Sequence, residues 1–176
     1  MEQHTRTLVI FGATGDLCRR KLIPALEDLH RRKLLPDSFK IIGASRTDHD
    51  RQSWLESLGK YYKAEFSLML DYHRCDLSDV DSLRSIPQSD DMTYFLSVPP
   101  ERYGDAIQNL KAAGLVDDRD KTRVIIEKPF GTDLQSANHL QSVVERSLRE
   151  KQVYRIDHYI CQDNGQCDRL VSRVDI

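Results

Sequence analysis

Short apolar runs alternate along the chain with longer segments whose apolar residues recur every three or four positions. The runs have the length of β-strands and span residues 7–11, 40–44, 69–72, 93–98, 122–127 and 153–156. The periodic segments predict helices over residues 16–33, 53–63, 101–113 and 134–149. Strands that alternate with helices build βαβ units, so the expected fold class is α/β, a doubly wound, Rossmann-like parallel sheet.

A proline and a glycine mark two of these helices. Pro24 lies inside the segment 16–33, where its ring and its missing N–H are expected to bend the helix. Gly114 directly follows the segment 101–113, the position at which a glycine commonly ends a helix. We therefore expect a bent first helix and a glycine cap after residue 113.

The composition narrows the class of protein. The 176 residues are 39% hydrophobic and 31% charged, as in an ordinary globular domain, and no internal boundary is visible. The net charge of −2 argues against nucleic acid or an anionic membrane as a partner, and no apolar stretch approaches the roughly 20 residues of a membrane span. The cysteines, Cys18, Cys75, Cys161 and Cys167, lack metal-ligand spacing, which predicts no metal site and reduced thiols in the cytoplasm.

A glycine pattern, FGATGDLC, separates the first strand from the first helix. Gly12 permits a tight turn, Gly15 lets backbone N–H groups approach a pyrophosphate, and the helix N-terminus favours its negative charge. The spacing is GxxGxxC rather than GxGxxG, with Cys18 in the small third position. The context predicts a dinucleotide site. The alternatives are a plain structural turn and, for Asp16, a helix cap.

The residues after the second strand indicate which dinucleotide. An acidic residue there would accept the ribose 2′-hydroxyl of NAD, but this chain has Ser45 and Arg46. A hydroxyl donor and a planar cation suit a 2′-phosphate. The prediction is therefore NADP, with Arg46 as an exposed loop charge being the alternative.

A lysine ends the strand 122–127, in the sequence EKPFG. Side chains at the carboxyl end of a parallel strand face the crevice in which ligands bind. Pro129 restricts Lys128 to extended geometry and permits a cis bond before it. Lys128 is therefore a candidate site residue, against the alternative of a surface turn.

Several motifs together resemble the glucose-6-phosphate dehydrogenase family. They are GATGDLCRRKLIPAL, ASR, YFLSVPPERY, EKPFGTDLQSA and YRIDHY, and they follow the family's order over residues 7–159. The resemblance implies an oxidoreductase of the pentose phosphate pathway that oxidises glucose 6-phosphate to 6-phosphogluconolactone with NADP.

The resemblance also implies roles for single residues. The coenzyme diphosphate would be lined by Gly12, Thr14, Gly15, Asp16 and Leu17, the 2′-phosphate by Ser45 and Arg46, and the nicotinamide by Lys128. The substrate would be held by Lys128, His158 and Tyr159, and Asp157 would orient a catalytic histidine. From the residues alone, Asp157 and His158 are instead a buried pair at the end of a strand.

The catalytic histidine of the family is not matched in this sequence. It belongs to a second, α+β domain that also makes the family's dimer interface, and none of the histidines before the DHY signature sits in a matching motif. After Ile160 the sequence departs from the family, with Gln162 where a phosphate-binding lysine is expected. A shift of one base would permit that lysine, so we hypothesise a frameshift. The expectation is an NADP-binding domain over residues 1–160 and a divergent, disordered tail over 161–176.

Three functions remain open. The first is a glucose-6-phosphate dehydrogenase truncated to its coenzyme domain, with little or no activity. The second is a non-catalytic NADP-binding module. The third is an oxidoreductase of the short-chain or sugar-epimerase type. The last class needs a tyrosine four residues before a lysine, and no tyrosine here has that spacing.

Overall fold

The computed structural model describes residues 4–131 and 133–156. Within them lies one six-stranded parallel sheet, with strands β1 (Arg6–Phe11), β2 (Phe39–Ser45), β3 (Leu70–Arg74), β4 (Asp91–Leu96), β5 (Thr122–Glu127) and β6 (Val153–Ile156). The strand order is β3-β2-β1-β4-β5-β6. The chain adds β2 and β3 on one side of β1 and then continues with β4 on the other side, so the strand order reverses between β1 and β4. This is the order of a doubly wound, dinucleotide-binding sheet, so the predicted fold class is confirmed.

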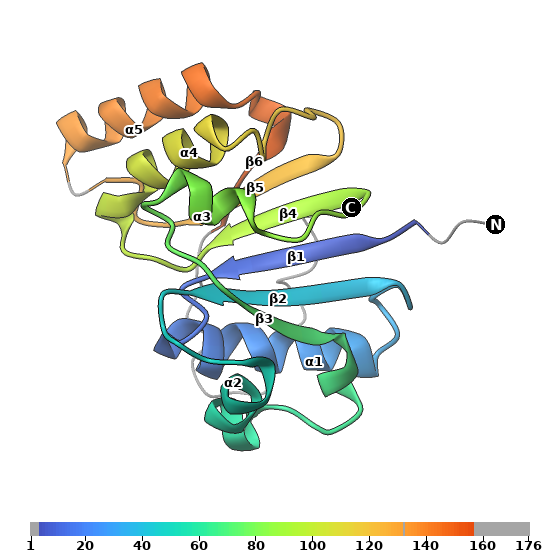
Figure 1. The fold of residues 1–176 in the computed structure, drawn as a ribbon. Helices are drawn as coiled ribbons and strands as arrows, with labels where there is room; N and C mark the ends of the chain where they lie inside the picture. Colours follow the sequence, from blue (N-terminus) through green and yellow to red (C-terminus); the bar gives the residue numbers. More distant parts are fainter. Residues whose placement is uncertain (1–3, 132, 157–176) are drawn as a thin grey trace.

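Helices cover both faces of the sheet (Figure 1). One face packs against α1 (Ile23–Arg31) and α2 (Arg51–Leu58), and the other against α3 (Val80–Arg84), α4 (Tyr103–Ala112) and α5 (Leu134–Ser147). Short 3-10 helices span Gly59–Tyr61, Phe66–Met69, Pro100–Arg102 and Glu150–Gln152. In the described part of the chain, no helix has the length and hydropathy needed to cross a bilayer.

The central strand is buried on both faces. Val9 and Phe11 contact the core under α3, α4 and α5, whereas Leu8 and Ile10 contact the core under α1 and α2. Successive side chains of a strand point to opposite faces, and both faces are covered here. That is why β1 is a continuous apolar run in the sequence instead of an alternating one.

The first helix is interrupted where the sequence predicts a bend. A π-helical turn, Cys18–Leu22, leads into α1, and Pro24 is near the first residue of that α-helix. Proline has no N–H to donate, and its ring would meet the carbonyl group four residues earlier. A wider π-turn accommodates this disruption, since π-turns relax the regular spacing of helical hydrogen bonds.

The remaining helix ends follow from capping. α2 begins before the predicted residue 53 because the Asp50 carboxylate accepts the N–H of Ser53 at 2.8 Å, and it ends at Leu58 because Gly59 has φ +57°. The cap predicted at Gly114 is confirmed: its N–H donates to Lys111 O at 3.0 Å. The next N–H donates to Leu110 O, also at 3.0 Å, which completes a Schellman motif.

Candidate dinucleotide site

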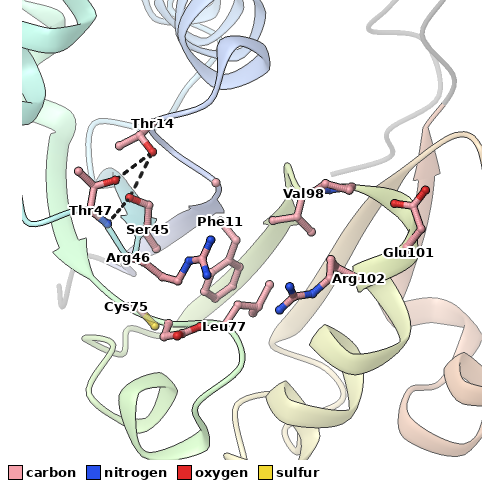
Figure 2. A pocket seen from close by; sticks show the side chains of 14 residues that line it. Phe11, Thr14, Ser45, Arg46, Thr47, Cys75, Leu77, Val98, Glu101 and Arg102 are labelled. Carbon is pink, nitrogen blue, oxygen red and sulfur yellow. Dashed lines mark hydrogen bonds between the residues drawn. The ribbon is translucent and has the colours of Figure 1, made fainter.

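A cleft of about 740 Å³ opens at the carboxyl ends of β1, β2, β3 and β4 (Figure 2). It includes the place where the strand order reverses, which is where open α/β sheets bind their ligands. Of the residues predicted from the sequence, it brings together Gly12, Thr14, Ser45 and Arg46.

The predicted glycine turn forms part of the cleft. Gly12 has φ +81°, a left-handed conformation that side chains rarely adopt, and its N–H donates to Ala44 O at 2.9 Å. The N–H of Gly15 closes the turn on Gly12 O at 2.9 Å. A β-carbon on Gly12 would lie 2.1 Å from the carbonyl oxygen of Ser97. The missing side chain therefore lets the turn lie against the end of β4.

Cys18 occupies the third position of the glycine pattern and is fully buried against the sheet. A small residue is needed there because the helix packs closely on β1. Burial raises the pKa of the Cys18 thiol to about 12, so the thiol stays protonated at neutral pH. Cys75, which lines the cleft, is also buried, and burial raises its pKa as well. Both described cysteines are free thiols, as predicted.

Hydroxyl groups connect the glycine turn to the loop after β2. Thr14 Oγ1 lies 3.4 Å from both Ser45 Oγ and Thr47 Oγ1 (Figure 2). The N–H of Thr47 donates to Ser45 Oγ at 3.2 Å, which turns the loop back on itself around Arg46. The two predicted parts of the site are therefore adjacent walls of one cleft.

Two arginines face each other across the cleft. Figure 2 shows Arg46 reaching into it from the β2 side and Arg102 from the α4 side. Among the described residues, Arg46 has no hydrogen bond or ion pair, whereas Arg102 donates to Ser78 Oγ. The carboxylates of Asp76 and Glu101 also belong to the lining. Arg46 thus presents an unpaired planar cation to any anion that enters.

Asp16 is exposed on the first helical turn. Its carboxylate accepts from Arg19 Nη2 at 2.6 Å and lies 3.6 Å from Arg20. The hydrogen bond from Arg19 is the main cause that lowers the pKa of Asp16. The side chain therefore forms a surface ion pair, beside the turn that also contains Gly15 and Leu17.

Lys128 lies two strands away from the glycine turn. It follows β5, its N–H donates to Ile156 O at 3.1 Å, and its peptide bond to Pro129 is cis. Glu127 pairs with Ile156 in the sheet, so the EKPFG loop follows the strand that neighbours β6. The predicted site residues Asp157, His158 and Tyr159 lie outside the described residues.

Several cleft residues were not predicted as site residues. They are Thr47, Cys75, Asp76, Leu77, Val98, Pro99, Glu101 and Arg102. Val98 ends the predicted strand 93–98, the others follow a predicted strand closely, and Val98 to Arg102 belong to the YFLSVPPERY motif. Their position at or just after the carboxyl end of a strand was the signal that could have identified them.

One buried hydroxyl group next to the cleft has no hydrogen-bond partner among the described residues. It is Ser97 Oγ, which is buried at the end of β4. Such groups are rare and call for an explanation. Ser97 itself does not line the cleft, whereas Gly12 with its close backbone approach and the unpaired Arg46 do, and these two features suit an anionic dinucleotide. No cluster of three or more potential metal ligands is found among the residues described.

Comparison with known proteins identifies the family. Residues 9–166 match the family model described as "Glucose-6-phosphate dehydrogenase, NAD binding domain". The chain belongs to the glucose-6-phosphate dehydrogenase family. This confirms the resemblance inferred from the motifs, and it assigns the matched part to a domain that binds a nicotinamide coenzyme.

Relatives within the glucose-6-phosphate dehydrogenase family agree with this assignment. The glucose-6-phosphate 1-dehydrogenase of Chlamydia muridarum is 34% identical over 188 residues, which cover 90% of this chain and 37% of that protein. A solved glucose-6-phosphate dehydrogenase in complex with glucose 6-phosphate has a TM-score of 0.77 at 31% identity and covers 89% of this chain and 37% of its own. The structure of glucose-6-phosphate 1-dehydrogenase from Mycobacterium avium has a TM-score of 0.76 at 31% sequence identity. It covers 86% of this chain and 36% of its own. The chain thus spans a little over a third of these relatives.

Proposed function

We propose that this chain is the coenzyme-binding part of a glucose-6-phosphate 1-dehydrogenase and that its coenzyme is NADP. The observation that carries the choice of NADP is the unpaired Arg46 guanidinium, placed after β2 on the wall of the cleft. Gly12, Thr14, Gly15, Asp16 and Leu17 would hold the diphosphate. Arg46 would hold the 2′-phosphate, in a loop that also contains Ser45 and Thr47.

The proposed substrate is glucose 6-phosphate, which would be oxidised to 6-phosphogluconolactone. When bound, NADP supplies a nicotinamide ring that can accept a hydride. Lys128 follows β5, and we propose that it lies between the nicotinamide and the sugar. His158 and Tyr159 would hold the 6-phosphate, because an imidazolium and a phenol are suitable donors. Asp157 would orient the catalytic histidine of the family, which is a different residue from His158 and is not matched in this sequence.

Replacing Arg46 with alanine is expected to weaken NADP binding about tenfold to a hundredfold and to leave NAD binding unchanged. A charge-assisted hydrogen bond to a phosphate is worth this much, and NAD has no 2′-phosphate. Isothermal titration of both coenzymes measures the two affinities.

A matched control is Arg74→Ala. Arg74 ends β3 near Asp48 but does not line the cleft, so its loss removes the same charge without removing the proposed contact. An equal loss of NADP affinity in both variants would show that Arg46 contributes only to the overall electrostatic attraction between the protein and the coenzyme. An equal loss of NAD and NADP affinity in Arg46→Ala would contradict a 2′-phosphate contact.

A second candidate function is a non-catalytic NADP-binding module, and one observation favours it. No histidine of the described residues lines the cleft, so no histidine base is placed there. For the 176-residue chain we therefore expect NADP binding without reduction when glucose 6-phosphate is added. NADPH absorbance is the measurement, and steady turnover would contradict the expectation. If the chain binds glucose 6-phosphate and Lys128→Ala weakens that binding, the chain is part of a glucose-6-phosphate dehydrogenase and not a non-catalytic NADP-binding module.

A further inference from the structure

Tyr72 places its hydroxyl group under the loop that carries Arg46. The hydroxyl oxygen lies 2.7 Å from Thr47 O, 2.8 Å from Ser45 Oγ and 3.3 Å from Ser45 O. These partners belong to the residues directly before and after Arg46. One hydroxyl group therefore contacts both sides of the proposed 2′-phosphate loop, although Tyr72 itself does not line the cleft.

The directions of these hydrogen bonds follow from counting hydrogens. A tyrosine hydroxyl has one hydrogen, and its shortest contact with a pure acceptor is Thr47 O. The bond to Ser45 is then donated by Ser45 Oγ, which in turn accepts the N–H of Thr47 at 3.2 Å. The bonds form a closed ring. The only hydrogen of the Ser45 hydroxyl is used on Tyr72 and is not available to a phosphate.

The ring of Tyr72 is itself fixed by packing. The centroid of its ring lies 5.8 Å from that of His49, which it meets edge-on, and 5.5 Å from that of the Trp54 indole. Trp54 Nε1 donates to Ala13 O at 3.3 Å, in the glycine turn. The same pair of aromatic side chains thus supports the proposed diphosphate turn and the proposed 2′-phosphate loop.

We propose that Tyr72 is a positioning residue that determines the preference for NADP over NAD. Its hydroxyl holds residues 45–47 so that the Arg46 guanidinium faces the 2′-phosphate before the coenzyme arrives. Holding an exposed loop in its binding conformation removes the entropy cost of ordering it on binding. Ser45 then acts through the loop. Thr14 donates its hydroxyl hydrogen to Ser45 Oγ, so the side-chain donor left for the phosphate is Arg46. This inference rests on the proposed function, NADP binding.

Tyr72→Phe removes the hydroxyl and keeps the ring that packs on Trp54 and His49. NADP affinity is expected to fall about three- to tenfold, and NAD affinity to stay within about twofold, because only NADP uses the loop. The readout is the ratio of the two dissociation constants, measured by isothermal titration. Tyr94→Phe is the matched control, since it removes another buried tyrosine hydroxyl, bonded to Gln88, in the core on the opposite face of the sheet.

The double variant tests the hydrogen-bond ring itself. If Ser45 acts through the Tyr72 ring, adding Ser45→Ala to Tyr72→Phe weakens NADP by less than Ser45→Ala does alone. If Ser45 contacts the phosphate independently, the two effects multiply and the inference is overturned. Thermal unfolding shows whether Tyr72→Phe folds. If it does not fold, the ratio of the NADP and NAD dissociation constants in Ser45→Ala tests the role of the loop. In that case an unchanged coenzyme ratio in Ser45→Ala overturns the inference.

The outcomes separate this inference from the proposed function. A wild-type chain that does not prefer NADP overturns both. A wild-type preference for NADP that survives in Tyr72→Phe leaves the proposed function standing and overturns the role of Tyr72. Equal losses for NAD and NADP also overturn it, because a merely structural hydroxyl would affect both coenzymes alike.

Discussion

Gly12→Ala is expected to abolish detectable NADP binding and to lower the free energy of unfolding by roughly 2–5 kcal/mol. Two costs add at this position. The backbone has φ +81°, where a β-carbon is strained, and that β-carbon would lie 2.1 Å from Ser97 O. The obstacle is backbone rather than a movable side chain, so β1 and β4 must separate at the cleft. Urea unfolding and a coenzyme titration measure the two effects.

Gly59→Ala separates the two costs. Gly59 also has a positive φ, +57°, but a β-carbon there meets no atom within 4 Å. This variant is expected to lose only the conformational part, roughly 1–2 kcal/mol, and to bind NADP normally. If the two variants lose equal stability and both retain the coenzyme, the close approach of Gly12 to β4 does not matter for the site.

The fold was predictable because its signals are local and repeat along the chain. The apolar run of β1 and the glycine turn after it identify a strand and a turn without knowledge of any distant residue. β6 was predicted with the bounds that the structure gives it. By contrast, α3 covers only five residues, too few to show a helical period, and was missed. The start of α2 was misplaced because the cap at Asp50 was not considered.

The candidate site was predictable only in part, because side-chain direction depends on contacts between strands. The sequence indicates that Ser45 and Arg46 end a strand, but not that Tyr72 pairs in register with Gly43 and reaches them. It also does not show that Arg46 lacks a partner or that Arg102 faces it. The roles of Lys128, Asp157, His158 and Tyr159 stay predictions, and the last three lie outside the described residues.

Gly43 explains why a large side chain can stand behind both loops. A β-carbon on Gly43 would lie 2.4 Å from the indole ring of Trp54. The glycine in the middle of β2 therefore leaves room for the indole against the sheet, at a position where a strand usually has a branched side chain. Since Trp54 contacts both Ala13 and Tyr72, the absence of one side chain in β2 determines how the cleft is supported.

Trp54→Ala is accordingly expected to lower the free energy of unfolding by roughly 3–5 kcal/mol and to weaken NADP and NAD together. Trp54 is fully buried, and its removal leaves a cavity between Gly43 and Tyr72 and an unpaired Ala13 carbonyl. It is the chain's single tryptophan, so unfolding must be followed by far-UV circular dichroism. Trp54→Phe keeps an aromatic ring and should lose about half as much. An alanine variant as stable as the wild type, or one that loses NADP alone, would contradict a shared support under both loops.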